Sequence, residues 1–183
     1  MDVKYAIKTW PGASRMNDSL DRKITARALT REAFVPFGDV IDKPSYPERT
    51  PINGGHARRL PPMAEAMVRG EGGRVSISLI EGDPYKFPLK LDLVERHPLG
   101  SQAFIPLTPD PFVVIVCPDQ NNRPGKPHAF ITAPGQGVNY RANVWHGVLT
   151  PLVAQDFLVV DRAGEGVNLE EWRFAEPWIV LLD

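Results

Sequence analysis

Glu95 and His97 are the residues whose types and spacing first suggest chemistry in this sequence. Residues two apart on a strand project to the same face, so the carboxylate and the imidazole would lie together while Arg96 points away. A proline and a glycine would then break the strand, and Gln102 would open a second one. An acid, an imidazole and an amide at one bend suit acid–base catalysis or metal binding.

Two of the four histidines are candidates for a functional site, because His97 and His146 flank apolar strands and have polar neighbours at matching parity. His56 and His128 lie in stretches rich in glycine or proline, where a solvated histidine is the ordinary expectation. Tyr140 shares the parity of His146 and could face the same pocket. A core tyrosine with a satisfied hydroxyl explains it equally well.

Short apolar runs, about 8 to 14 residues apart, would position these side chains. Residues 112–117 are apolar throughout, which predicts a central strand covered on both faces. Residues 75–79 and 89–93 alternate apolar with polar side chains, which predicts strands with one face in the core. Further short strands are predicted at 24–29, 39–41, 129–132, 138–141, 146–149 and 157–161. This pattern indicates a β-sandwich or a small barrel.

The remaining stretches predict a short helix, a long loop and two terminal segments. Thr30 is a plausible N-cap for a helix over residues 31–34. Residues 42–62 are rich in proline and glycine, and we expect a long loop that could cover a pocket. The tail would form a helix or an edge segment that packs back or meets another subunit. Residues 1–22 have no clear period and predict a loosely ordered extension, which leaves 23–183 as a single domain.

Composition favours a folded domain that acts on a small molecule. At 183 residues and 43% hydrophobic, the chain can bury a substantial core, and its length favours one domain. The net charge of −1 comes from 21 basic and 22 acidic residues mixed along the chain, which does not favour nucleic acid or an anionic membrane as partner. Its single cysteine, Cys117, excludes an intramolecular disulfide and fits a reducing compartment. With no signal peptide or membrane span evident, we expect a cytoplasmic protein.

The spacing of the candidate residues resembles the two motifs of the cupin superfamily. There the first motif supplies His-x-His and a later Glu, and the second supplies another His around a metal. Here the first motif reads Glu95-x-His97-x4-Gln102, and His146 takes the place of the second-motif histidine. The resemblance implies a mainly β fold, a cupin-like double-stranded β-barrel (jelly-roll) with a few short helices. It also implies four candidate metal ligands: Glu95, His97, Gln102 and His146.

Three separated blocks resemble the ureidoglycolate lyase family of allantoin degradation: residues 93–106, 135–146 and 156–162. The resemblance extends back through residues 37–41 and 52–55. It implies a cupin-like homodimer that cleaves (S)-ureidoglycolate to glyoxylate and urea in purine nitrogen catabolism, a carbon–nitrogen lyase of the amidine-lyase type. Nickel is the divalent metal that the resemblance implies. Manganese or no metal are the alternatives, since a neutral amide such as that of Gln102 is a weak ligand.

The catalytic residues that this reading implies are Glu95, His97, His146 and Tyr140. Ureidoglycolate is a carbinolamide, and it collapses when its hydroxyl loses a proton while its nitrogen gains one. Glu95 and His97 could supply the base and its partner, and His146 or Tyr140 the acid. A metal would instead bind the hydroxyl and carboxylate oxygens. Histidines that bind the metal could not also carry protons.

Five residues are candidates for binding the substrate: Asn53, Gly54, Gln102, Phe104 and Arg162. Arg162 could clamp the substrate carboxylate with two hydrogen bonds, or pair with Asp161 or Glu165 at the surface. Asn53 and the following glycines could close over the substrate, or form a simple turn. Gln102 could instead be an interior amide hydrogen-bonded to backbone.

Two other functions stay open. A non-catalytic cupin-like module that senses a small acid would use the same pocket, and a metal-dependent cupin oxygenase or isomerase would use similar ligands. Release of urea and glyoxylate from ureidoglycolate would separate the three.

Overall fold

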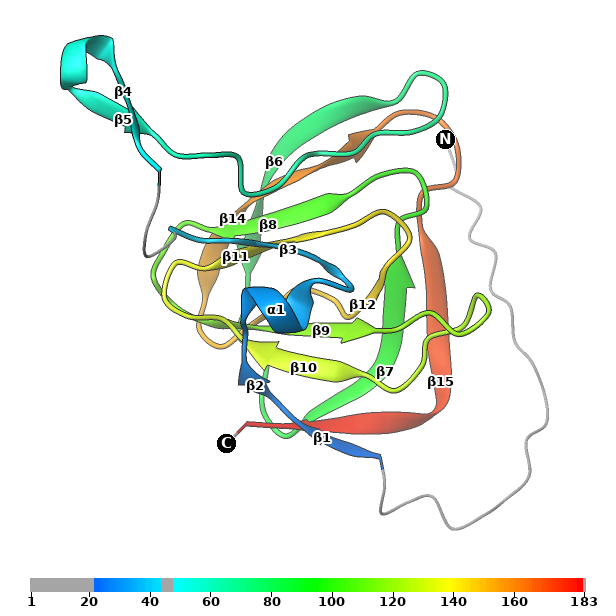
Figure 1. The fold of residues 1–183 in the computed structure, drawn as a ribbon. Coiled ribbons are helices and arrows are strands. Elements are labelled where there is room, and N and C mark those ends of the chain that lie inside the picture. The colour runs from blue at the N-terminus through cyan, green and yellow to red at the C-terminus, as the bar shows by residue number, and fades with distance from the viewer. Residues whose placement is uncertain (1–21, 44–47, 183) are drawn as a thin grey trace.

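The computed structural model describes residues 22–43 and 48–182, and these form a mainly β fold (Figure 1). The part of the chain that it describes contains one α-helix, α1 (Arg31–Phe34), and one 3-10 turn, η1 (Asn53–Gly55). Thr30 caps the helix as predicted, because its hydroxyl oxygen accepts a hydrogen bond from the backbone N–H of Ala33. The prediction of a mainly β, cupin-like barrel with few short helices is confirmed.

Two sheets make the barrel. The larger has the order β1-β15-β7-β12-β9-β10-β2, with β13 paired to β9. Its strands are β1 (Lys23–Thr25), β2 (Arg27–Ala28), β7 (Leu89–Arg96), β9 (Phe112–Cys117), β10 (His128–Ile131), β12 (Trp145–His146), β13 (Thr150–Pro151) and β15 (Glu170–Leu181). The smaller has the order β3-β11-β8-β14-β6. Its strands are β3 (Gly38–Ile41), β6 (Arg74–Gly82), β8 (Gln102–Pro106), β11 (Gly137–Tyr140) and β14 (Gln155–Ala163).

Strand β9 shows how the core is divided. All six of its residues are buried, as its continuous apolar run predicts. Phe112, Val114 and Val116 belong to a cluster to which both sheets contribute, including Phe104 and Phe157 of the smaller sheet. The alternate residues of β9 join a second cluster on the other face of the larger sheet, where side chains of β1 and β15 cover it. The strand is therefore covered on both faces.

Strand β6 forms where predicted, but its apolar face does not enter the core. Val75, Ile77 and Leu79 are 50%, 69% and 64% exposed. β6 is the edge of the smaller sheet, and its register with β14 places these side chains on the face opposite the buried Phe157 and Val159. The predicted core face is wrong because alternation reveals that a strand has two different faces without revealing which one points inward.

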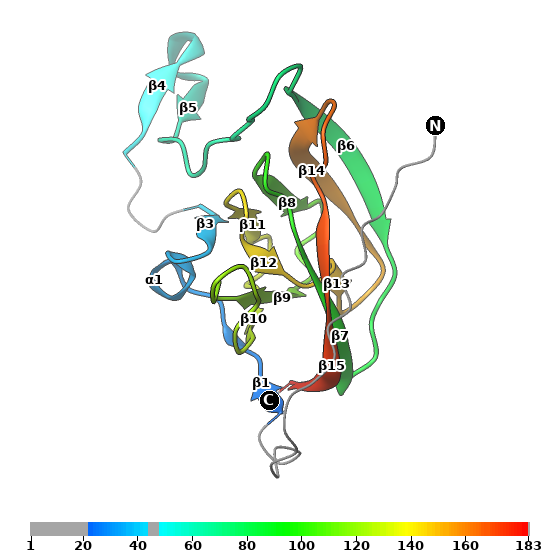
Figure 2. The same cartoon turned by 90° about the vertical axis from the view of Figure 1, so that its right-hand side faces the viewer.

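Part of the predicted loop over residues 42–62 is a hairpin. Strands β4 (Thr50–Ile52) and β5 (Ala57–Arg59) pair around η1 and project away from the barrel in both views (Figures 1 and 2). Asn53, Gly54 and Gly55 have φ values of 53°, 63° and 91°, and this left-handed backbone makes the tight reversal. The loop prediction is therefore wrong for residues 50–59.

Three other stretches differ in detail from their predictions. The run 24–29 contains two strands, because β1 pairs with β15 and β2 pairs with β10. Of the run 146–149, His146 ends β12, and the other three residues lie between β12 and β13. The tail is a strand, β15, which pairs with β7 as well as with β1. No helix in residues 22–43 or 48–182 is long and apolar enough to span a membrane. The predicted extension over 1–22 lies, except for residue 22, outside the described residues.

Candidate active site

Glu95, His97 and His146 come together on the larger sheet. One ligand atom from each lies within 4.8 Å of the others, the only such group of metal-binding side chains in the ranges that the structure describes. β7 carries Glu95 near its end, and His97 follows directly. β12 runs antiparallel to β7 and places His146 opposite Glu95. The two-residue spacing therefore brings the acid and the first imidazole to one face, and strand pairing supplies the second.

Backbone carbonyls orient both imidazoles. His97 Nδ1 lies 2.7 Å from the carbonyl oxygen of Asn168, and His146 Nδ1 lies 2.9 Å from that of Gly147. A carbonyl only accepts hydrogen bonds, so in each neutral ring Nδ1 carries the proton and Nε2 presents a lone pair. Both Nε2 atoms are buried without a hydrogen-bond partner. The Nε2 lone pairs of His97 and His146 therefore lie close to the Glu95 carboxylate without a hydrogen-bond partner.

Glu95 and His97 favour a charged pair. Their closest atoms, Oε1 and Nε2, are 3.8 Å apart, which is longer than a hydrogen bond. Burial alone would lower the pKa of His97, but the Glu95 carboxylate, the Asn168 carbonyl and the charge of Asp161 raise it overall. Burial alone would raise the pKa of Glu95, but His97 and the charge of His146 lower it overall. His97 therefore takes up a proton more readily than a solvated histidine does.

His146 behaves in the opposite way. Burial lowers its pKa to about 4, and the charge of His97 adds to this effect, while Glu95 and the Gly147 carbonyl act against it. The ring is thus neutral at pH 7. A neutral ring whose Nδ1–H is already bonded suits metal binding or proton acceptance better than the acid role.

Tyr140 lies against this cluster from the opposite sheet. Its ring stacks on His146, with centroids 4.2 Å apart and planes at 3°. Phe104 meets Tyr140 edge-on at 6.0 Å between centroids, and both belong to the core cluster between the sheets. Burial raises the pKa of the Tyr140 hydroxyl, and the charge of Glu95 raises it further. Its hydroxyl therefore stays protonated.

Gln102 occupies the next strand of the same sheet. It pairs with Tyr140 in the register between β8 and β11, so the two side chains project to one face. Its Oε1 is buried and has no hydrogen-bond partner. The alternative of an interior amide hydrogen-bonded to backbone therefore does not account for this oxygen.

The guanidinium of Arg162 donates hydrogen bonds to the backbone of two loops. Its Nε donates to the carbonyl of Arg69 and its Nη2 to the carbonyl of Glu165, each at 2.7 Å. Its side chain is buried and passes over Gly100. Within the described ranges it forms no ion pair with Asp161 or with the Glu165 carboxylate.

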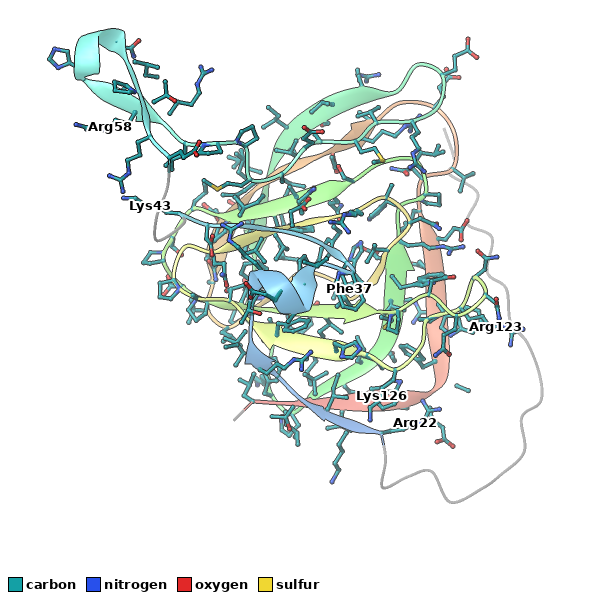
Figure 3. The ribbon with its side chains drawn as sticks, viewed as in Figure 1. Arg22, Phe37, Lys43, Arg58, Arg123 and Lys126 are labelled. Atoms are coloured by element: carbon teal, nitrogen blue, oxygen red, sulfur yellow. The ribbon has the colours of Figure 1, made fainter. Side chains whose placement is uncertain are left out.

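Asn53 and Gly54 are not brought to the cluster within one chain. They form the exposed tip of the β4–β5 hairpin, where Figure 3 shows Arg58 well away from the barrel. Of the candidate residues, the structure therefore gathers Glu95, His97, His146, Tyr140, Gln102 and Phe104.

Two residues that the sequence did not single out for the site contribute to it. Asp161 shares the parity of the buried Phe157 and Val159, and its charge acts on His97. The two-residue period of the strand predicted at residues 157–161, which places Asp161 on the same face as Phe157 and Val159, is the signal that could have found it. Asn168 holds His97 through its backbone carbonyl, and its side chain accepts a hydrogen bond from the N–H of Leu99. A contact made by backbone has no signature in residue types.

Comparisons with known proteins agree on one family. The family model described as Ureidoglycolate lyase matches residues 21–181. The chain is 60% identical over 161 residues to the "Ureidoglycolate lyase" of Mesorhizobium japonicum (strain LMG 29417 / CECT 9101 / MAFF 303099), which covers 87% of this chain and 98% of the relative. Identity to the "Ureidoglycolate lyase" of Chelativorans sp. (strain BNC1) is 59% over 162 residues, with coverage of 88% and 98%. Identity to the "Ureidoglycolate lyase 2" of Rhizobium meliloti (strain 1021) is 52% over 155 residues, with coverage of 84% and 94%.

Among solved structures, a dTDP sugar isomerase from Desulfovibrio desulfuricans G20 aligns with a TM-score of 0.37 at 17% identity. The alignment covers 77% of this chain and 87% of the isomerase. This likeness is too slight to bear on the fold or the function.

Proposed function

The chain belongs to the ureidoglycolate lyase family, and we propose that it performs the lyase reaction at the cluster of Glu95, His97 and His146. The protein is an enzyme, a ureidoglycolate lyase, as the names of its relatives indicate. The reaction proposed is cleavage of (S)-ureidoglycolate to glyoxylate and urea in allantoin breakdown. The observation that carries the assignment of the site is the convergence of two unpartnered Nε2 atoms on a carboxylate inside the barrel.

The donor set fits a first-row divalent metal. Two neutral imidazoles and a carboxylate are ligands that such ions accept. Burying an Nε2 atom without a hydrogen-bond partner is unfavourable, and a bound metal would remove this cost. Glu95, His97 and His146 would hold the ion, and Gln102 is the fourth candidate ligand. Nickel is the metal proposed from the family resemblance, with manganese or no metal as alternatives. When bound, the ion would lower the pKa of the substrate hydroxyl.

The protein residues then divide the proton transfers between them. Cleavage requires the hydroxyl to lose a proton and the leaving nitrogen to gain one. With Glu95, His97 and His146 occupied as ligands, the hydroxyl of Tyr140 would donate its proton to the nitrogen, and the Tyr140 oxygen would then take up the proton that the substrate hydroxyl loses. In a metal-free enzyme, Glu95 would take the hydroxyl proton and His97, with its raised pKa, would donate to the nitrogen.

We propose that the enzyme is a homodimer. Strand β6 supports this, because Val75, Ile77 and Leu79 expose apolar surface on the edge of a sheet, and a second copy would cover it. Light scattering coupled to size-exclusion chromatography would give the mass. Ile77→Lys in this face should yield monomers, and a dimer of unchanged affinity would contradict the assignment of this face.

The domain boundaries, the cellular location and the partner are also proposed. We infer that residues 23–183 form one domain and that residues 1–22 extend from it. The single buried thiol of Cys117 is compatible with a cytoplasmic location. The partner proposed is a small molecule, ureidoglycolate, and neither nucleic acid nor a membrane.

Turnover of ureidoglycolate tests the function directly. The purified protein is incubated with (S)-ureidoglycolate, with added nickel or manganese and after chelation, and urea and glyoxylate are followed. Both products should form in equal amounts and faster than the spontaneous reaction. Absence of both products above the spontaneous rate would reject the lyase, and ammonia in place of urea would indicate hydrolysis. Binding without turnover would favour the sensing module, and oxygen consumption the oxygenase.

A further inference from the structure

Three strands of the smaller sheet align polar side chains on its inner face. Gln102 pairs with Tyr140 on one side. On the other side, β8 and β14 pair Phe104 with Val159 and Ala103 with Val160. Continuing this register by one residue brings Asp161 opposite Gln102. Phe104 and Val159 are buried in the core between the sheets, so the side chains two residues further along each strand face the same interior.

Asp161 and Gln102 are acceptors that the protein leaves without donors. Oε1 of Gln102 is buried and unpartnered. In the part of the chain that the structure describes, the Asp161 carboxylate has no hydrogen bond or ion pair, although it is partly buried. The neighbouring guanidinium of Arg162 is engaged with two backbone carbonyls instead. Leaving the buried Gln102 Oε1 without a donor is costly unless a ligand supplies one, and the partly exposed Asp161 carboxylate can accept from the same ligand.

These two acceptors also lie beside the reaction centre. Tyr140, the cross-strand partner of Gln102, stacks its ring on the imidazole of His146. Asp161 lies two residues beyond Val159 on β14, so it faces the same interior, and its charge is among the influences that raise the pKa of His97. Cross-strand neighbours have Cβ atoms about 5 Å apart, a spacing that suits one small planar group held between two side chains.

We propose that Asp161 and Gln102 bind the ureido half of the substrate by accepting its N–H groups. The inference rests on the proposed function, and it assigns Gln102 Oε1 to the substrate in preference to a metal. The ureido group offers three N–H donors, whereas the rest of ureidoglycolate offers oxygens. The substrate then lies with its carboxylate and hydroxyl toward Glu95, His97 and His146. Its terminal NH₂ lies between Asp161 and Gln102, and each of these side chains accepts one of its two N–H groups.

This arrangement makes Asp161 a determinant of specificity. A carboxylate that accepts from an amide NH₂ group rejects a methyl group at the same position, because its acceptor atoms would be left unpaired. It also repels a second carboxylate in the ligand. The enzyme should therefore distinguish ureido acids from acyl amino acids and dicarboxylates of equal size.

Two unreactive analogues test the inference. Hydantoate lacks only the reacting hydroxyl of ureidoglycolate, and N-acetylglycine carries a methyl in place of the terminal NH₂. Their dissociation constants, from calorimetry or competitive inhibition, should differ by about tenfold or more in favour of hydantoate in the natural protein. Asp161→Asn should reduce this ratio about tenfold, because it replaces an acceptor oxygen with a donor and removes the charge. Asp156→Asn, an exposed carboxylate on the same strand, should leave the ratio unchanged.

The result that would overturn the inference is an unchanged ratio, or equal weakening of both analogues in Asp161→Asn, which would mean that Asp161 acts through the fold or through His97. Should Asp161→Asn fail to fold, Gln102→Met provides the same comparison, since Oε1 has no internal bond to lose. A lowered ratio in Gln102→Met supports the inference and an unchanged ratio overturns it. Turnover by the natural protein is measured separately. Selective binding of hydantoate without turnover would refute the lyase function and support the ureido-binding site. Turnover of ureidoglycolate with an unchanged ratio in the variants would support the lyase function and refute the ureido-binding site.

Discussion

The phenol ring of Tyr140 lies flat against the imidazole of His146, 4.2 Å away between centroids and only 3° from parallel. The two residues come from different sheets, so this stack joins the sheets at the site. Together with the Gly147 carbonyl, which bonds Nδ1, the stack fixes both the plane and the tautomer of the ring. His146 Nε2 is consequently held in place before any ligand arrives.

Two substitutions separate the role of the Tyr140 ring from that of its hydroxyl. Tyr140→Phe keeps the stacked ring and removes the hydroxyl, so kcat should fall by about a hundredfold to ten-thousandfold, with little change in stability. Tyr140→Leu removes the stack as well and should cost about 1 to 3 kcal/mol of unfolding free energy. Steady-state kinetics and guanidinium unfolding measure the two effects. Full activity in Tyr140→Phe would exclude its hydroxyl as the proton donor.

Metal content should depend on the two clustered histidines. His97→Ala and His146→Ala should each lower bound nickel or manganese to background, because each removes an Nε2 ligand from the site. Elemental analysis of protein dialysed against limiting metal gives the stoichiometry. His56→Ala, on the exposed hairpin, is the matched control and should keep its metal. Equal metal content in all three variants would place the ion elsewhere.

Glu95→Gln should lower both kcat/KM and the pKa of His97. The change is nearly isosteric and removes the charge beside His97, so kcat/KM should drop by about a hundredfold or more. In the metal-free protein the pKa of His97 should also fall, because the Glu95 carboxylate is among the groups that raise it. Imidazole NMR titration checks this. Glu81→Gln, on the exposed strand β6, should change neither quantity, and a His97 pKa that does not fall in Glu95→Gln would show that the two residues are uncoupled.

The metal-free protein should lose stability on both sides of pH 6.5. Below that value the unfolded chain protonates His146 while the folded chain does not until about pH 4, so acidification costs about 3 kcal/mol across this interval. The raised pKa of His97 works in the other direction. Its contribution is full below pH 6.5 and disappears as the pH rises through its folded value. Guanidinium unfolding at several pH values should show the acid slope reduced in His146→Gln. An identical slope in this variant would assign it to other groups.

Arg162 should prove more important for folding than for substrate binding. Arg162→Ala leaves the carbonyls of Arg69 and Glu165 without donors, which should cost about 2 to 4 kcal/mol. Arg162→Lys should recover only part of this loss, since an ammonium cannot reproduce the fork of the guanidinium. Unfolding midpoints and KM are both measured. Normal stability with a strongly raised KM would restore the predicted carboxylate clamp.

The sequence was most informative where residue type and strand period coincide. The spacing of Glu95 and His97 predicted their shared face, and the apolar run of β9 predicted a strand buried on both sides. It was less informative where one pattern allows two orientations. The alternation of β6 suits an inward or an outward apolar face, and only the sheet order decides between them. The carbonyl of Asn168 and the turn of Arg162 toward the loops depend on chain geometry, which residue types do not encode.

The burial of Cys117 makes this chain convenient for spectroscopic labelling. The thiol is 1% exposed, and burial raises its pKa to about 12, so maleimide or methanethiosulfonate reagents should not reach it in the folded protein. It is also the only cysteine in the sequence. A cysteine introduced at the hairpin tip, such as Asn53→Cys, would therefore carry a single spin or fluorescent label without removal of the native thiol. Distances between two such labels would report where the hairpin lies in an assembled enzyme.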